Sequence, residues 1–282
     1  MYWRKIKALL QMTRPINGFT AGIAAVFAYL VNTQYNINPY IMAIGFMVGY
    51  LGSASAMLIN DVVDLEVDRI NKPWKPLPQG ILSKNTVAVL SIIFLSTSIA
   101  INLLISIAAT IVAALLIITG YCYSFMRRFW WSHFIVSIST IAPFIYGYVV
   151  AGMPSKTLVF NTLFAMVVFL INSSREFTKA IADYEGDKKL GYSTIATKYG
   201  ICTASFAAVV AAFAGAVLAV LIGLFGLANM YYTIILFIAG SIFSYYAYRA
   251  YRDPSKDTCT KAKNVMIFMM LFALLGYLLS QL

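Results

Sequence analysis

The charged residues of this chain fall into five short islands, and the stretches between the islands are long and apolar. The islands lie at 4–14, 61–84, 127–128, 175–198 and 249–263, and the stretches run over 15–60, 85–126, 129–174 and 199–248, with Lys156 as the one interruption. A helix needs about 20 apolar residues to cross a bilayer. Each stretch, at 42–50 residues, is therefore long enough for two spans that turn on the far side of the membrane.

Residues that favour turns lie near the middle of each stretch. They are found at 32–39, near Asn102, at 151–156 and at 223–229, and Asn, Gly and Pro are the usual breakers there. Four hairpins and a last apolar run at 264–282 give nine spans. With 61% hydrophobic residues and a mean hydropathy of +0.80, the sequence predicts an all-α membrane protein with a single domain over residues 1–282. We expect its nine transmembrane helices to surround a central cavity that is open to the cytoplasmic side.

The hairpins place nearly all charges on one face. That face carries 20 of the 21 Lys and Arg residues and all ten acids. Because loops rich in Lys and Arg stay in the cytoplasm, we expect this face, the N-terminus and the active site to be cytoplasmic in a multi-pass protein of the cell membrane. The net charge of +11 follows from this topology. It favours an anionic substrate, and we expect no nucleic-acid partner.

Eight of the ten acidic residues lie in two clusters, at 60–68 and 176–187, each at the end of an apolar run. A carboxylate inside a bilayer costs about 2.5–3.5 kcal/mol, so such residues need a partner. At 3.6 residues per turn, each cluster places Asp residues on one helix face. These are Asp61, Asp64 and Asp68 in the first cluster, and Asp183 and Asp187 in the second. Both clusters contain the spacing Asp-x-x-x-Asp, which hints at two related halves of the chain.

Carboxylates that face one another at a membrane edge are suited to hard divalent cations. Mg²⁺ prefers six oxygen ligands and usually takes one or two carboxylates together with substrate phosphates. We therefore expect Mg²⁺ as the cofactor, held between the clusters by these Asp residues and the amide of Asn60, and with it a phosphate or diphosphate. The alternative is that the clusters are solvated loop acids that balance nearby Lys and Arg.

Basic residues lie close to both clusters. Lys75 follows the first cluster in a Pro-rich loop, Arg127 and Arg128 end the fourth span, and Lys179 shares a helix face with Asp183. All four are candidate ligands of diphosphate oxygens. Their alternative role is to anchor the spans on the cytoplasmic side.

The order of these residues resembles the UbiA superfamily of intramembrane prenyltransferases. The first signature of that family is similar to Asn60-Asp61-x-x-Asp64-x-x-x-Asp68 followed by Asn71-Lys72-Pro73-x-Lys75-Pro76-Leu77-Pro78-x-Gly80, and its second Asp-rich motif is similar to 183–191. Two further elements are similar, Tyr123-Ser124-x-x-Arg127-Arg128, with Arg127 in place of the more usual Lys, and Arg14-Pro15-x-Asn17. The resemblance covers nearly the whole chain.

The resemblance implies Mg²⁺-dependent transfer of a prenyl group from its diphosphate. The catalytic carboxylates would be Asp64, Asp68, Asp183 and Asp187, and the residues along the substrates would be Arg14, Asn17, Tyr123 and Tyr146. The two tyrosine rings could face an allylic cation, although aromatic residues in membrane helices are more often part of the core or the interfacial belt. Arg14 or Lys179 could bind a phosphate of the acceptor.

Within the family, the loop around Lys75 and the string Arg175-Glu176-x-x-Lys179 look most like the branch that builds archaeal ether lipids. That branch joins geranylgeranyl diphosphate to the hydroxyl of a lipid phosphate, geranylgeranylglyceryl phosphate. Lys75 and Ala180 depart from its usual Arg and Asp. Aromatic or chlorin acceptors, as in quinone, tocopherol or chlorophyll synthesis, therefore stay open. Membrane lipids are expected neighbours, and the sequence specifies no protein partner.

Two other classes fit the sequence less well. CDP-alcohol phosphotransferases are also membrane enzymes with repeated Asp residues and a divalent metal, but their string Asp-Gly-x-x-Ala-Arg is missing here. A transporter of divalent cations or diphosphate would need polar residues on the far face, where Lys156 is the sole charge. A prenyltransferase is therefore the preferred hypothesis.

Overall fold

The computed structural model describes residues 2–126 and 128–282, and the regular elements within them are all helical. In chain order these are α1 (Tyr2–Thr13), α2 (Pro15–Asn32), α3 (Pro39–Val63), α4 (Leu65–Asn71), α5 (Lys84–Ala100), the 3₁₀ helix η1 (Ile101–Leu104), α6 (Ile107–Met126), α7 (Ser132–Val150), α8 (Ser155–Ala182), α9 (Tyr184–Lys189), α10 (Ile195–Tyr199), α11 (Ile201–Leu224), α12 (Met230–Arg252) and α13 (Lys256–Leu279). Among the described residues, nine helical segments are long and apolar enough to span a membrane: α2, α3, α5 with η1, α6, α7, α8, α11, α12 and α13. The predicted all-α class and the nine spans are confirmed.

The turns on the far side fall where the sequence placed them, and polar side chains cap the helices there. Asn38 accepts a hydrogen bond from the backbone N–H of Ile41 at the start of α3, and Asn229 accepts one from Tyr232 at the start of α12. Asn102 in η1 donates its side-chain amide to the carbonyl of Ser98 at 2.7 Å. Such caps satisfy backbone groups that a helix end leaves unpaired.

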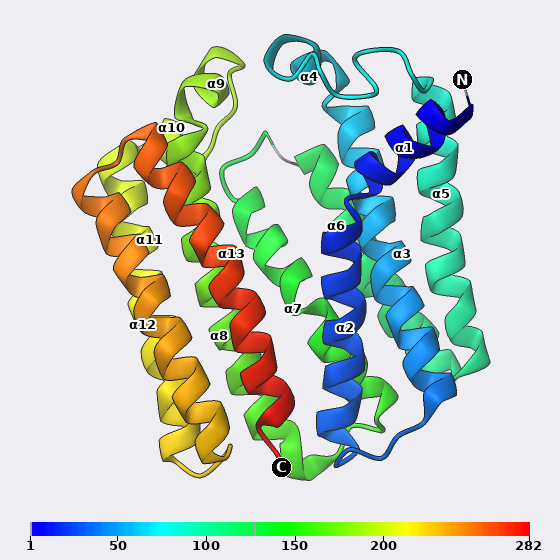
Figure 1. Ribbon diagram of the computed structural model, residues 1–282, viewed down its shortest axis with the longest axis vertical. Helices are drawn as coiled ribbons and strands as arrows, with labels where there is room; N and C mark the ends of the chain where they lie inside the picture. Colours follow the sequence, from blue (N-terminus) through cyan, green and yellow to red (C-terminus); the bar gives the residue numbers. More distant parts are fainter. Residues whose placement is uncertain (1, 127) are drawn as a thin grey trace.

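The spans form two neighbouring rings of helices that share a wall. In one ring α2, α7, α8 and α13 follow one another, and in the other α2, α3, α6 and α7 do so. α5 packs on the outside of α3, while α11 and α12 pack outside α8 and α13. The N-terminus lies at one end of the bundle and the C-terminus at the other (Figure 1).

The shared wall is the contact between α2 and α7, and one glycine brings the two helices together. Gly147 on α7 lies against Ala28 and Tyr29 on α2, and a Cβ at this position would come within 2.7 Å of the Tyr29 backbone nitrogen. A residue without a side chain is therefore needed for this close approach. The contact separates the interiors of the two rings toward the far side.

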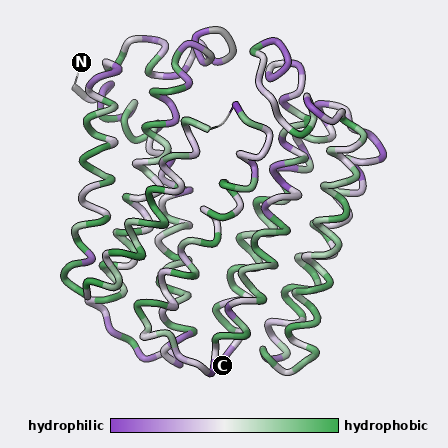
Figure 2. Tube along the Cα trace, turned by 180° about the vertical axis from the view of Figure 1, so that it is seen from behind, coloured by the Kyte–Doolittle hydropathy of each residue, from purple (hydrophilic) through white to green (hydrophobic). Residues whose placement is uncertain are grey.

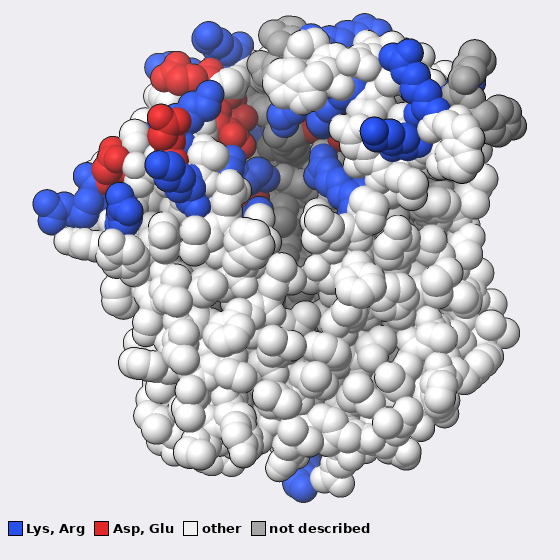
Figure 3. Space-filling view, viewed as in Figure 1, with Lys and Arg blue, Asp and Glu red and all other residues white. Residues whose placement is uncertain are grey.

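Polar residues concentrate at the two ends of the bundle, and the middle is apolar (Figure 2). Lys, Arg, Asp and Glu gather at the end that carries α1, α4, α9 and α10, which we call the charged end (Figure 3). A depression lies in this end between groups of charged side chains. Lys156, at the start of α8, lies at the opposite end.

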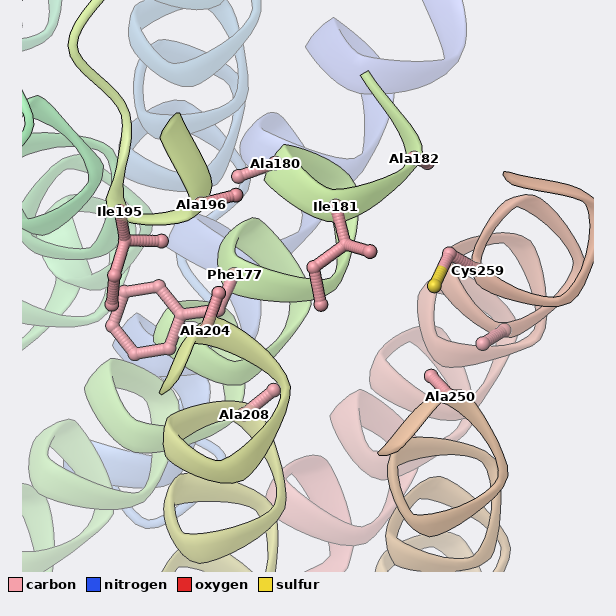
Figure 4. Packing of buried hydrophobic residues seen from close by; sticks show 11 residues of the cluster. Phe177, Ala180, Ile181, Ala182, Ile195, Ala196, Ala204, Ala208, Ala250 and Cys259 are labelled. Atoms are coloured by element: carbon pink, nitrogen blue, oxygen red, sulfur yellow. The ribbon is translucent and has the colours of Figure 1, made fainter. Parts of the chain in front are cut away.

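A buried apolar cluster fixes the rotation of α8 at the charged end. Phe177 and Ile181 of α8 pack there with small residues of the neighbouring helices, namely Ala204 and Ala208 of α11, Ala250 of α12 and Cys259 of α13 (Figure 4). Small residues allow helices in a membrane to approach closely. Because Phe177 and Ile181 face this cluster, Glu176 and Lys179 point to another side of α8.

Candidate active site

The first acidic cluster lies where α3 ends and α4 begins. Asp61 is in the last turn of α3, Asp64 links the two helices and Asp68 is in α4. Asp64 is a single non-helical residue between the two helices. The helical hydrogen bonds nevertheless continue across it, from the N–H of Asp64 to Asn60 (2.9 Å) and from the N–H of Asp68 to Asp64 (2.8 Å). The three carboxylates therefore keep their helical spacing, and all three are buried.

Lys75 reaches back into this cluster from the loop that follows it. Its Nζ lies 2.9 Å from Asp61 Oδ1 and 2.5 Å from Asp68 Oδ2. Leu77 anchors the loop, because its side chain is buried among apolar residues of α1, α3, α4 and α5. A buried carboxylate without a partner is strongly destabilising, and Lys75 supplies that partner for both Asp61 and Asp68.

Arg14, just before α2, also contacts the first cluster. Its guanidinium lies 3.4 Å from Asp61 Oδ1 and 3.0 Å from Met57 Sδ. The sequence placed Arg14 along a bound substrate. Arg14 therefore lies beside the first acidic cluster and not in the lining of the apolar cavities described below, and its place along a substrate stays a prediction.

The second acidic cluster repeats this arrangement where α8 ends and α9 begins. Asp183 is the single residue between the two helices, and the N–H of Asp187 in α9 donates to its carbonyl at 3.0 Å. Asp187 is buried, whereas Asp183 is partly exposed and lies 3.7 Å from the Nζ of Lys263. The titratable side chains that line a recess of about 20 Å³ beside them are Tyr123, His133, Glu176, Lys179, Asp183, Asp187 and Tyr192.

The two clusters fit a divalent cation that is shared with a phosphate ligand. α4 and α9, which carry Asp68 and Asp187, stand on opposite sides of the depression at the charged end (Figures 1 and 3). In the described part of the chain, no three Asp, Glu, His or Cys side chains converge closely enough to hold a metal by themselves. Mg²⁺ does not need such a cage, since it commonly uses one or two carboxylates and completes its shell with water and phosphate oxygens.

Two apolar cavities lie below the charged end, and both are bordered by α2, α7 and α8. The first, of about 360 Å³, is lined by α2, α7, α8, α11, α12 and α13, and we call it the α13 cavity. The second, of about 320 Å³, is lined mainly by α2, α3, α6 and α7, and we call it the α3 cavity. Both volumes lie in the range of roughly 300–1,000 Å³ that is typical of ligand pockets.

The two cavities meet at a set of shared residues, which we call the collar. It consists of Asn17, Ala21, Ser139, Thr140, Pro143, Asn172 and Arg175. Pro143 has no N–H, so the carbonyl of Ser139 loses its usual helical donor. The collar is therefore a polar zone between two apolar spaces, and the predicted lining residue Asn17 is part of it.

Tyr123 and Tyr146, both predicted to lie along the substrates, are at different depths. Tyr123, near the end of α6, lines both the α3 cavity and the recess beside Asp187. Tyr146 also lines the α3 cavity, but its hydroxyl donates to Asn102 at 2.6 Å, in the far-side turn. At 1.5 Å per residue, Tyr146 lies about 20 Å along α7 from Ser132 at the charged end. Tyr146 therefore lies deep in the α3 cavity, and its role beside the reacting carbon stays a prediction.

Two of the four cations predicted for the diphosphate lie at the acidic clusters, namely Lys75 and Lys179. Arg128 is exposed, and its guanidinium carbon lies 5.3 Å from the ring centroid of Phe129. Its backbone carbonyl accepts a hydrogen bond from the N–H of Ser193 at 3.1 Å, beside Tyr192 of the recess, so its role at the diphosphate stays a prediction. Arg128 is not among the residues that line the recess or the two cavities. Arg127 lies outside the described residues.

Three residues of the collar, Ser139, Thr140 and Arg175, were not predicted from the sequence to have a separate functional role. Arg175 did carry a signal, because it follows Asn172 by three residues and precedes Lys179 by four, which places all three on one face of α8. Ser139 and Thr140 carried none, since hydroxyl residues are common in membrane helices.

Fold and site together define a membrane protein with two acidic clusters and basic residues above apolar cavities, an arrangement suited to ligands with phosphate heads and apolar tails. The model of the UbiA prenyltransferase family matches residues 21–275. The chain therefore belongs to this family of multi-pass membrane enzymes, and the resemblance seen in the sequence is confirmed.

Individual relatives agree with this assignment over nearly the full length. The digeranylgeranylglyceryl phosphate synthase of Methanosphaera stadtmanae is 30% identical over 275 residues, which cover 97% of this chain and 98% of that protein. A solved structure of a digeranylgeranylglyceryl phosphate synthase matches with a TM-score of 0.78 and 28% identity, covering 98% of each chain. A UbiA homologue from Archaeoglobus fulgidus bound to GPP and Mg²⁺ shares the fold, with a TM-score of 0.70 and 19% identity over 96% of this chain and 99% of that one.

Proposed function

We propose that this protein transfers the geranylgeranyl group of geranylgeranyl diphosphate to the hydroxyl of geranylgeranylglyceryl phosphate, forming an ether and releasing diphosphate. The observation that carries the proposal is the pair of apolar cavities that meet at one polar collar. Each substrate has a phosphate head and one long apolar tail. The reaction therefore needs two tail sites and one place where the heads meet. Relatives named digeranylgeranylglyceryl phosphate synthase support this acceptor.

The second cavity favours a lipid acceptor over an aromatic one. A compact acceptor such as 4-hydroxybenzoate would occupy the collar and leave one of the two cavities, each above 300 Å³, without a ligand. A lipid phosphate would fill it with its tail. Burial of that tail removes apolar surface from water and supplies binding energy.

In this proposal the donor diphosphate lies between the two acidic clusters. Mg²⁺ bound there would neutralise the diphosphate and make it a better leaving group; the GPP- and Mg²⁺-bound homologue supports this choice of metal. The residues that would hold it are Asn60, Asp61, Asp64, Asp68, Asp183 and Asp187. Lys75 and Lys179, which lie at the clusters, would donate charge-assisted hydrogen bonds to diphosphate oxygens.

The bond changes follow from this placement of the heads. The bond between C1 of the prenyl chain and the diphosphate oxygen breaks, and its electron pair leaves with the diphosphate. The acceptor oxygen forms the new bond to C1, and its proton passes to solvent or to diphosphate. Tyr123 lies between the recess and the α3 cavity, where its ring face would stabilise positive charge at C1 by about 0.5–2 kcal/mol.

The charged end faces the cytoplasm in this proposal. The distribution of Lys and Arg, 20 of 21 on one face, supports this orientation. The diphosphate would therefore enter with the donor and leave as product on the same side of the membrane.

The acceptor can be tested with a panel of substrates. The protein is purified, reconstituted into lipid nanodiscs and given radiolabelled geranylgeranyl diphosphate with geranylgeranylglyceryl phosphate, 4-hydroxybenzoate or homogentisate. We expect a labelled diether phosphate with the first acceptor only, no product after chelation of metal by EDTA, and recovery on addition of Mg²⁺. Product with an aromatic acceptor and none with the lipid phosphate would reject the proposed acceptor.

A further inference from the structure

Arg175 is the only charged side chain that lines either apolar cavity within the described part of the chain, and it lines both. It lies on α8, three residues beyond Asn172, whose amide donates to the hydroxyl of Ser137 on α7 at 3.2 Å. This contact helps to fix α8 against α7 at the level of the collar. The side chain of Arg175 is 21% exposed, so the collar surrounds most of it.

Glu176 holds the guanidinium of Arg175 from one side. Arg175 donates to Glu176 Oε1 at 2.7 Å, and Lys179 donates to Glu176 Oε2 at 3.2 Å. The carboxylate of Glu176 is buried, with an exposure of 2%. Two cations and one carboxylate leave the group with one net positive charge, which favours an anion beside it.

Glu176 does not use all the hydrogen-bond donors of the Arg175 guanidinium. The Nε of Arg175 is buried and has no hydrogen-bond partner among the described residues. A buried donor without an acceptor is costly. The planar fork of a guanidinium matches the oxygens of a phosphate, and a phosphate at the collar would supply the missing acceptor.

The other cations of the site belong to the acidic clusters. Lys75 and Arg14 contact Asp61, and Lys179 lines the recess that also contains Asp183. A donor diphosphate held between the clusters would meet these groups. Arg175, by contrast, belongs to the collar, where the α13 cavity and the α3 cavity meet, below the acidic clusters.

We propose that Arg175 binds the phosphate of the lipid acceptor and that Glu176 positions its guanidinium. This inference rests on the proposed function, because it assigns a residue to the acceptor of that reaction. A glycerol backbone has only three carbons, so the reacting hydroxyl is at most two carbons from the phosphate. Binding of the phosphate at the collar therefore places the nucleophile where the cavities meet, and selects lipid phosphates over neutral alcohols.

Arg175→Gln removes the charge and keeps a polar side chain. We expect the KM for geranylgeranylglyceryl phosphate to rise by about 30-fold. The KM for the donor should not change, and kcat at saturating acceptor should stay within about threefold. Geranylgeranylglycerol, the same acceptor without phosphate, should be used equally by wild type and variant. Arg252→Gln, which removes an exposed arginine at the end of α12, is the matched control and should change none of these values.

Two further variants cover the case in which Arg175→Gln fails to fold. Arg175→Lys keeps the charge but not the fork and should give an intermediate KM for the lipid phosphate. Glu176→Gln should also raise that KM. Equal losses of Arg175→Gln with the phosphate-bearing and the neutral acceptor, or a raised donor KM in Arg175→Gln, would overturn the assignment.

A binding measurement separates this inference from the proposed function. Tritiated geranylgeranylglyceryl phosphate is titrated onto the protein in nanodiscs, in EDTA and without donor. Wild type should bind it and Arg175→Gln should bind at least about tenfold more weakly; equal binding by both would reject the role of Arg175. Failure of the wild type to form any diether would instead reject the proposed function, whatever the binding result.

Discussion

Asp64→Asn and Asp183→Asn are each expected to lower the rate of prenyl transfer by about 10³-fold, because a lost metal ligand removes several kcal/mol of charge stabilisation. The two residues occupy equivalent places, each as the single residue between a long membrane helix and a short helix at the charged end. Asparagine keeps the size of the side chain and leaves the backbone hydrogen bonds of the junction in place. The measurement is kcat with radiolabelled donor, together with the melting temperature in detergent.

Matched controls separate this effect from a general loss of negative charge. Glu66→Gln and Glu185→Gln remove a carboxylate from the same two clusters, at positions that are exposed. Glu66 is 76% exposed and pairs with Arg69 at 2.9 Å. Both controls should keep near wild-type rates. Full activity in either Asp variant, with an unchanged melting temperature, would contradict the metal-binding assignment.

Filling one cavity should lower turnover of the two long-chain substrates by about 10²-fold, because a displaced tail moves the head out of its reactive position. Ala56→Phe adds a ring to the α3 cavity, and Val168→Phe adds bulk to the α13 cavity; each residue lines only one of the two. Val217→Phe, at a residue of α11 that is 55% exposed, is the control and should be neutral.

The shortened substrate that restores activity should differ between Ala56→Phe and Val168→Phe. If each tail has its own cavity, one variant is rescued by geranyl diphosphate as a shorter donor and the other by an acceptor with a shorter chain. The rescue is measured as kcat/KM for each combination of donor and acceptor. Rescue of both variants by the same shortened substrate would mean that the tails do not occupy separate cavities.

The spans were predictable because a bilayer leaves the chain few alternatives. Backbone groups in lipid must be paired within a helix, so the long uncharged stretches and their Asn, Gly and Pro residues were enough to place the turns. The acidic clusters were visible for a similar reason, since carboxylates at the ends of apolar runs require a partner. The breaks at Asp64 and Asp183 were not visible, because no Gly or Pro marks them and the helical hydrogen bonds continue across them.

The two cavities could not be predicted from the sequence of any single helix. Each is lined by residues from at least five helices, and the close approach of Gly147 on α7 to α2 is likewise a property of two helices packed together. The depth of Tyr146 and the pairing of Arg14 with Asp61 have the same origin. Helical periodicity shows which residues share one face of a helix. It does not show which residues of the neighbouring helices that face contacts.

The most direct test of this account is a cryo-electron microscopy structure of the protein in nanodiscs with Mg²⁺ and an unreactive thio analogue of geranylgeranyl diphosphate. We expect the diphosphate between α4 and α9, with metal density in contact with Asp64 or Asp68 on one side and Asp183 or Asp187 on the other, and the tail in one of the two cavities. A diphosphate held by one cluster alone, or a tail outside both cavities, would contradict it.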